Sequence, residues 1–210
     1  MLENSSVISA IIDKRKALSP QQALLVGISG IDASGKGFIT QTVAQRLRKD
    51  GWNVAIISAD DWLNLPEVCM NSDNYAEHFY QHAIRFDEML ERFILPLKQT
   101  RKINITADCA DAKTTTFCKE RYEFRNVDIV LLEGIFLFKP TYCHHFDLKI
   151  WIECSFETAM RRAISRGQEG LPPAETRYAF ETIYFPAQRI HLDRDDPRGA
   201  ADLILHNDDS

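Results

Sequence analysis

Apolar residues along the chain follow two alternating patterns, namely short continuous runs and longer stretches with helical spacing. Short apolar runs between turn residues are typical of strands covered on both faces. The strongest of them is Val127 to Leu132. We expect strands at residues 24–28, 54–58, 103–106, 127–132, 148–152 and 202–205.

Helical spacing occurs in the segments that separate these runs. Residues 5–18 place Val7, Ile8 and Ile11 on one face, which predicts a helix that packs against the core. Similar spacing predicts helices over residues 38–47, 86–97 and 157–166, and Pro96 is expected to interrupt the second of these near its end. We expect residues 107–126 to be irregular.

Strands that alternate with helices predict an α/β fold, in which a mostly parallel sheet of about five strands lies between two helical layers. The 210 residues contain no internal repeat or linker, so we assign residues 1–210 to one domain. Its parts are a packing helix at about 4–18, a core at 24–160, a helical lid at about 161–185 and a C-terminal strand at 202–206.

Composition narrows the classes of function. The formal net charge of -5 and the absence of a long basic run give no reason to expect nucleic-acid binding. Five cysteines without a CxxC pair favour free thiols in a reducing compartment over disulfides or a zinc site. No apolar run approaches the length of a membrane span and the N-terminus has no signal-like apolar core, so we expect a cytoplasmic protein without a membrane segment.

The segment after the first strand carries the clearest motif, GIDASGKG at residues 30–37. It matches the phosphate-binding pattern Gly-x-x-x-x-Gly-Lys, and it predicts a P-loop NTPase fold. Glycines let backbone N–H groups surround an anion, the next helix adds its N-terminal dipole, and the lysine reaches the terminal phosphates. The nucleotide-binding residues we expect are Gly30, Ile31, Asp32, Ala33, Ser34, Gly35, Lys36, Gly37 and Phe38.

Carboxylates stand at the ends of two other predicted strands. In parallel sheets ligands bind beyond the carboxyl ends of the strands. Glu133 follows the strongest strand and is our candidate for holding Mg²⁺, which takes few protein carboxylates and completes its shell with water and phosphate. Asp60 can accept the proton of an acceptor hydroxyl. Asp61 would lie on the other side of the backbone if the chain is extended. Its carboxylate is a candidate for capping, for binding water or for holding the metal.

Arginines form a third group, on the helix expected near residue 157. Arg162 and Arg166 are four residues apart, so they lie on the same face of this helix. If the helix forms a lid over the phosphates, both arginines could neutralise phosphate charge. We therefore add them to the catalytic candidates with Asp60 and Lys36. The alternative is an ordinary set of surface arginines.

In these elements the chain resembles the uridine kinase-like branch of P-loop kinases, a group that includes phosphoribulokinase and pantothenate kinase. The resemblance runs from about Leu24 to Asn207. It rests on GISGIDASGKG, SADDW, YQHAIRFDEMLERFILPL, VLLEGIFLFKP, FDLKIWIE and IYFPAQRIHLDRDDPRGAADLILHND. It implies an ATP:hydroxyl phosphotransferase with Mg²⁺, in which Asp60 is the base, Lys36 binds phosphates and Glu133 supports the metal. Family members are often dimers or tetramers, which leaves a homo-oligomer open.

Two departures from the family pattern concern the metal and the acceptor. Gly37 stands where a Ser or Thr hydroxyl usually binds Mg²⁺, and Thr40, one turn later, is the substitute we consider. The family's Tyr-Asp-Phe element and nearby His correspond to Ala107-Asp108-Cys109 and Ala112, so only Asp108 is kept as a contact for a ribose or another hydroxyl. The other acceptor candidates are Tyr80, His82 and Arg177, together with Tyr75, Phe79, Gln81, Tyr178 and Gln188.

The leading hypothesis is an ATP-dependent kinase that phosphorylates a hydroxyl of a small molecule, with a nucleoside as the first choice. A second choice is another acceptor, such as pantothenate, glycerate or a sugar phosphate. A hypothesis from a different class is a nucleotide-binding protein with little turnover, since Gly37 lacks the hydroxyl. The retained Lys36, Asp60 and Glu133 count against it, because a binding module needs no hydroxyl-activating aspartate.

Overall fold

The computed structural model describes residues 2–69, 73–110, 115–167 and 170–208. Its strands are β1 Leu24–Gly30, β2 Val54–Ser58, β3 Ile103–Cys109, β4 Cys118–Phe124, β5 Ile129–Gly134, β6 Leu148–Glu153 and β7 Leu203–His206. Its helices are α1 Leu2–Ala17, α2 Lys36–Lys49, α3 Pro66–Cys69, α4 Tyr75–His82, α5 Phe86–Met89, α6 Leu95–Thr100, α7 Pro140–Cys143, α8 Phe156–Arg166, α9 Pro173–Ala179, α10 Phe185–Asp195 and α11 Pro197–Ala200. Within the described ranges, no helix combines the length and the apolar character needed to cross a membrane.

Five strands form the central sheet in the order β2-β5-β1-β6-β7, and every pairing between them is parallel. The sheet confirms the predicted α/β class. Strand β1 lies in the middle and is buried along its whole length, as its continuous apolar run predicts. All five carboxyl ends meet at one edge, where the polar residues predicted from the sequence follow their strands.

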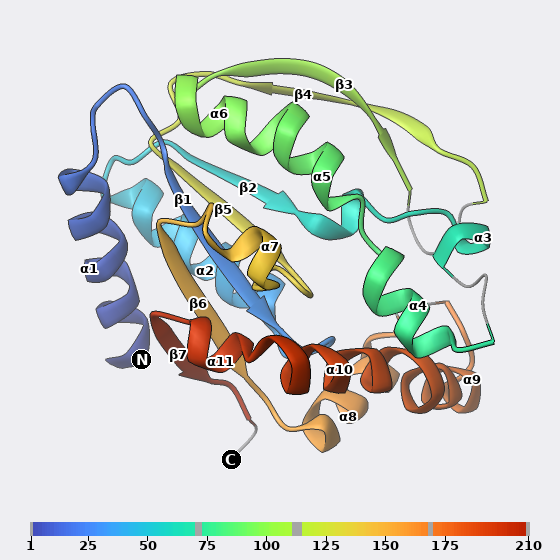
Figure 1. Ribbon diagram of the computed structural model, residues 1–210. Coiled ribbons are helices and arrows are strands. Elements are labelled where there is room, and N and C mark those ends of the chain that lie inside the picture. The colour runs from blue at the N-terminus through green and yellow to red at the C-terminus, as the bar shows by residue number, and fades with distance from the viewer. Residues whose placement is uncertain (1, 70–72, 111–114, 168–169, 209–210) are drawn as a thin grey trace.

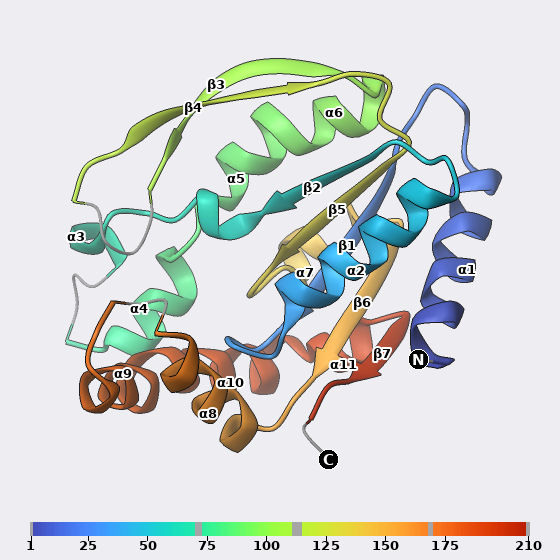
Figure 2. The same ribbon diagram turned by 180° about the vertical axis from the view of Figure 1, so that it is seen from behind.

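Helices cover both faces of this sheet (Figures 1 and 2). Helices α1 and α2 pack on one face, where Val7, Ile11 and Val43 join the apolar side chains of β1, β5 and β6. The segments from α4 to α6 and from α8 to α10 cover the other face around a larger apolar cluster that includes Phe93 and Ala187. The predicted three-layer arrangement is therefore correct.

The predicted strand at 103–106 is confirmed by β3, whereas the expectation that residues 107–126 are irregular was wrong. Residues 103–109 lie outside the central sheet, and they pair with an unpredicted strand, β4, in a separate antiparallel hairpin. The hairpin lies beside α5 and α6 (Figures 1 and 2). Its inner face packs on the helical segment through Tyr122 and Phe93, whose ring centroids are 4.7 Å apart. Strand β4 consists mostly of exposed residues, many of them charged, so a search for apolar runs does not find it.

Pro96 does not interrupt its helical segment, contrary to the prediction. A π-helical turn, Leu90–Ile94, lies immediately before α6 and joins it to α5. The same arrangement occurs before Pro186, where the π-helical turn Phe180–Tyr184 leads into α10. A proline inside a helix lacks an N–H and clashes with the carbonyl four residues earlier, and the wider turn relieves both problems.

Candidate active site

The phosphate-binding loop joins the end of β1 at Gly30 to the start of α2 at Lys36. Ala33 and Gly35 have φ angles of 55° and 91°, and left-handed residues in such a loop turn neighbouring N–H groups toward a common centre. A Cβ on Gly30 would lie 2.7 Å from the carbonyl oxygen of Ile152, so only glycine allows this packing of β1 against β6. The loop has the backbone form that cradles an anion at a helix N-terminus.

Lys36 lies across this loop. Its ammonium donates a hydrogen bond to the carbonyl oxygen of Ile31 at 2.9 Å, and only 8% of the residue is exposed. The charge of Lys36 also lowers the pKa of Glu133, so the two side chains are close enough to interact. The loop cation and the strand-end carboxylate therefore belong to one site.

Glu133 is the last residue but one of β5 and lies directly beside both β1 and β2, since it pairs in register with Ile28 on one side and Ser58 on the other. Its Oε1 accepts a hydrogen bond from the Ser58 hydroxyl at 2.7 Å. Burial raises the pKa of Glu133, Lys36 lowers it, and the nearby Asp60 and Asp61 raise it. A divalent cation would stabilise the charged form of a carboxylate in this position, because it would offset the cost of burial and the repulsion from the acidic neighbours.

The sequence is compatible with an extended chain at the two aspartates that follow β2, but the structure has a turn there. Ala59–Asp61 form a 3-10 turn capped by Ser58, whose hydroxyl oxygen accepts a hydrogen bond from the N–H of Asp60 at 3.3 Å. Asp60 is exposed, whereas Asp61 is partly buried. The turn therefore separates the two carboxylates, and Asp60 is the one open to solvent.

Asp61 faces the β3–β4 hairpin. Burial raises its pKa, followed by the charges of Asp60 and Glu120. Burial also raises the pKa of Cys109 to about 11, with Asp61 as the next cause. Burial and Asp61 likewise raise the pKa of Tyr122, whose hydroxyl therefore stays protonated at neutral pH. Glu120 and Tyr122 escaped the sequence search, although their alternate positions in the charged segment 118–124 indicate a shared strand face.

Three side chains from the C-terminal half of the chain hold the loop in place. Arg162 and Asn207 both donate to the carbonyl oxygen of Ser34, at 3.4 Å and 2.7 Å. Gln188, which we considered for the acceptor, instead makes two hydrogen bonds to Asp32. Arg162 thus lies against the loop, and its catalytic role stays a prediction. Arg166, in the last turn of α8, is exposed, and its role stays a prediction.

The remaining acceptor candidates lie in different surroundings. The hydroxyl of Tyr80 donates to Asp195 at 2.6 Å, and the residue is 6% exposed. His82 is exposed, with its ring 4.5 Å from that of His78. Arg177 lines a hollow of about 570 Å³ between α8 and the segment α9–α10. None of these contacts involves the strand-end aspartates, so the role of Tyr80, His82 and Arg177 in acceptor binding stays a prediction.

Asp108 lies on the outer face of the hairpin. Its carboxylate pairs with Lys119 at 2.6 Å, which lowers its pKa. Cys109 and Tyr122 lie on the other, inner face by the alternation of the strands. Ala112, the position compared with the family's histidine, lies outside the described residues.

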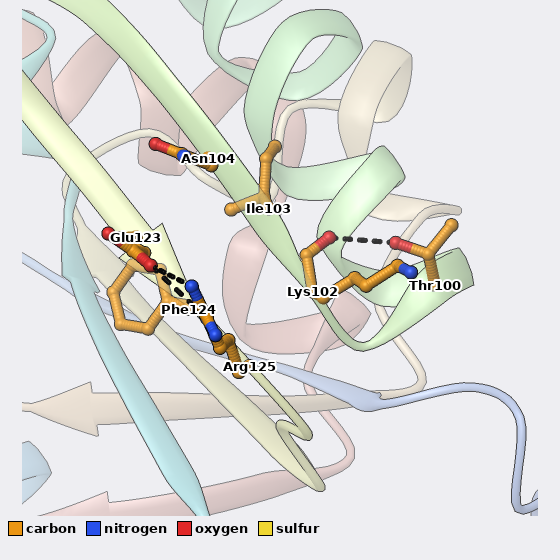
Figure 3. Close-up of a pocket in the computed structure, with 7 residues that line it drawn as sticks. All are labelled: Thr100, Lys102, Ile103, Asn104, Glu123, Phe124 and Arg125. Atoms are coloured by element: carbon orange, nitrogen blue, oxygen red, sulfur yellow. Dashed lines mark hydrogen bonds and ion pairs between the residues drawn. The ribbon is translucent and has the colours of Figure 1, made fainter.

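A further hollow, of about 500 Å³, lies at the opposite end of the hairpin (Figure 3). Its lining residues are Thr100, Lys102, Ile103, Asn104, Glu123, Phe124 and Arg125. The register pairs Ile103 with Phe124 there, whereas Cys109 and Cys118 pair at the end near Asp61. The hollow contains none of the predicted site residues, so the hairpin contributes to the candidate site only through its other end.

The donor set at the strand ends fits Mg²⁺. Glu133, Asp60 and Asp61 would offer carboxylate oxygens, and although no group of three or more such ligands converges among the described residues, Mg²⁺ needs only one or two carboxylates. A Cβ on Gly37 would meet nothing within 4 Å, so space exists where a hydroxyl usually stands. Thr40 is fully buried with an unpaired hydroxyl. Its burial argues against direct ligation by Thr40.

The parallel sheet, the loop and the strand-end carboxylates define a P-loop kinase fold. The sequence pattern of the phosphoribulokinase / uridine kinase family matches residues 25–170, and the chain belongs to this family. A uridine kinase from Shewanella frigidimarina is 24% identical over 153 residues, which covers 71% of each protein.

Solved structures support the same fold. A possible uridine kinase from Bacillus stearothermophilus superposes with a TM-score of 0.71 at 20% identity, over 94% of this chain and 96% of that one. A D-glycerate 3-kinase from Cryptococcus neoformans gives a TM-score of 0.66 at 11% identity, over 97% of this chain and 95% of that one. At such identities the likeness establishes the fold and leaves the acceptor open.

Proposed function

We propose that this protein transfers the γ-phosphate of ATP to a hydroxyl group of a small molecule, with a nucleoside as the leading acceptor. One observation carries the proposal, namely that the partly buried Glu133, held by the Ser58 hydroxyl, lies in register with the ends of β1 and β2, which lead into the phosphate-binding loop and the turn with Asp60. The candidate phosphate cation, metal ligand and base therefore occupy one edge of the sheet. Family members that act on uridine support the choice of acceptor.

The side chains have distinct parts in the proposed reaction. Lys36 and the N–H groups of the loop bind the β- and γ-phosphates. The hydroxyl oxygen of the acceptor bonds to the γ-phosphorus, and the bond between the γ-phosphorus and the ADP oxygen breaks. Asp60 accepts the proton of that hydroxyl during this step. Glu133 would hold Mg²⁺, which when bound offsets phosphate charge. Arg162, and Arg166 from the proposed lid, add positive charge to the transferring group.

The charge of the hairpin favours an acceptor without a carboxylate or phosphate group. Glu120 and Tyr122 occupy its inner face, and Glu120 interacts with Asp61. The neighbouring basic residues Lys119 and Arg121 lie on the outer face, where they contact Asp108 and Asn104. Carboxylates accept hydrogen bonds from hydroxyl groups and repel anions. This favours a nucleoside over glycerate, pantothenate or a sugar phosphate.

A basic side chain that contacts the hairpin, that of Arg85 just before α5, is already paired. Its guanidinium lies 5.2 Å from the ring centroid of Trp62. It forms an ion pair with Glu88 at 2.5 Å and donates to the carbonyl oxygen of Asp108. Since these partners use its charge, Arg85 does not reverse the acidic character set by Asp61 and Glu120.

The test of the proposed function is ADP release with Mg²⁺ and ATP in the presence of nucleosides, free sugars, pantothenate, glycerate and sugar phosphates. We expect a nucleoside to raise ADP release well above the rate without acceptor. ATP binding without acceptor-dependent ADP release from any compound would contradict the kinase proposal. It would favour the second candidate, a nucleotide-binding protein with little turnover, which Gly37 and the burial of Thr40 support.

A further inference from the structure

An acidic residue, Asp32, occurs inside the phosphate-binding loop, and a buried amide holds it from both sides. The backbone N–H of Asp32 donates to Oε1 of Gln188 at 2.9 Å. Nε2 of Gln188 donates in return to Oδ2 of Asp32. Gln188 lies on α10 and is 2% exposed, so it contacts the loop from within the protein.

These two contacts fix the orientation of the Gln188 amide. If the amide were turned over, its oxygen would face the Asp32 carboxylate and its NH₂ group would face the Asp32 N–H. Both pairs would repel each other. The N–H of Asp32 is also occupied by this contact, so the loop must bind phosphate through the N–H groups of later residues.

Helix α10 is anchored well enough to act as a support. Three of its polar residues, at spacings of three and four, face inward: Gln188, His191 and Asp195. Nδ1 of His191 lies 2.6 Å from Oδ2 of Asp195, and the same oxygen accepts a hydrogen bond from the hydroxyl of Tyr80 on α4. Gln188 thus contacts the loop, while Asp195 near the end of the same helix contacts α4. These contacts limit movement of Gln188 relative to Asp32.

A carboxylate in an anion-binding loop opposes the loop's function, because it repels the phosphates that the loop attracts. We propose that Gln188 is a positioning residue of the nucleotide site, which holds the Asp32 carboxylate away from the polyphosphate. The inference rests on the proposed nucleotide site. It extends that proposal by giving a residue outside the loop control over phosphate affinity.

The test measures dissociation constants by calorimetry for ATP, ADP, AMP and adenosine, without acceptor, in Gln188→Met, Asp32→Asn and the double variant. Methionine keeps the approximate size of glutamine but makes neither hydrogen bond. We expect Gln188→Met to weaken ATP binding about tenfold, ADP and AMP progressively less, and adenosine hardly at all. In the Asp32→Asn background the same substitution should change ATP affinity less than about threefold, since no charge is left to restrain. The control, Gln45→Met on an exposed position of α2, should bind as the parent does.

Each outcome bears on the inference. Equal losses of affinity in the parent and in the Asp32→Asn background, or equal losses for ATP and adenosine, would indicate a packing role and overturn it. Asp32→Asn alone should bind ATP at least as tightly as the parent, and weaker binding would also overturn it, whether or not Gln188→Met folds. A parent protein that does not bind ATP would defeat the proposed function as well, whereas a parent that binds ATP with unchanged variants would defeat this inference alone.

Discussion

The Ser58 hydroxyl donates a hydrogen bond to Glu133 at 2.7 Å, across two strands that place these residues opposite each other in register. The contact fixes one carboxylate oxygen of Glu133 and leaves the other for a cation. Residues that orient a metal ligand contribute strongly to metal affinity, and their loss commonly costs 10- to 100-fold.

Replacing Ser58 by alanine is therefore expected to raise the Mg²⁺ concentration needed for half-maximal activity by about 10- to 100-fold. The measurement is ADP release during a Mg²⁺ titration at saturating acceptor. Thr42→Ala is a matched control, because the Thr42 hydroxyl donates a hydrogen bond within α2, to the carbonyl oxygen of Phe38. An unchanged Mg²⁺ requirement in Ser58→Ala would show that Glu133 does not act through a metal.

Asp60→Asn should lower kcat by about 10²- to 10⁴-fold, the usual contribution of a general base, and leave ATP affinity nearly unchanged. Asparagine has the same shape but accepts no proton. The neighbouring Asp61→Asn is the matched comparison, and we expect its main effect on the KM of the acceptor because Asp61 faces the hairpin. If Asp60→Asn kept the parental kcat, the base would have to be another group.

The placement of the candidate residues at strand ends could be predicted from the sequence. Asp60 and Glu133 follow apolar runs, and parallel strands bring their carboxyl ends together, so local pattern and topology agree. Gln188 and Asn207 reach the loop across 156 and 173 residues, and their contacts depend on how α10 and β7 pack. Strand β4 was missed because its exposed face is charged, and the apolar pattern that identifies buried strands does not apply to it.

Gly37→Ser tests the altered position of the phosphate-binding motif. A Cβ at this position meets no atom within 4 Å, so the substitution should fold normally. We expect the added hydroxyl to lower the half-maximal Mg²⁺ concentration by about 3- to 10-fold, the gain of roughly one hydrogen bond or ligand contact. Gly37→Ala is the control for backbone effects, since alanine stabilises a helix relative to glycine without adding a ligand. A serine variant that matches the alanine variant would show that this hydroxyl is irrelevant here.

Glu120→Lys should change acceptor choice. Reversing the charge beside Asp61 removes repulsion toward anions, so kcat/KM for glycerate or a sugar phosphate is expected to rise about tenfold relative to that for a nucleoside. Glu123→Lys is a matched control, because it lies on the same strand but on the outer face, where it pairs with Arg121 and Arg125. The competing acceptors should be assayed together by product analysis. Equal shifts in both variants would mean that Glu120 does not face the acceptor.

Lys139 gives the protein a distinct dependence of stability on pH. Its ammonium lies 4.0 Å from the centroid of the Tyr80 ring, and burial lowers its pKa from 10.5 to about 8, against the opposing effect of Asp195 and Glu77. The unfolded chain holds this proton more tightly than the folded protein. The contribution of Lys139 to stability is therefore complete above pH 10.5 and is lost as the pH falls through 8.

Relative to Lys139→Met, the parent protein should gain free energy of unfolding between pH 8 and 10.5, by at most about 3 kcal/mol, because one pKa unit corresponds to about 1.4 kcal/mol. Urea unfolding of both proteins at about pH 8 and about pH 10 measures the difference. Lys49→Met, at an exposed position of α2, is the control and should give the same difference from the parent at both pH values. A pH-independent difference for Lys139→Met would mean that the ammonium stays protonated throughout, with its charge fully offset by Asp195 and Glu77.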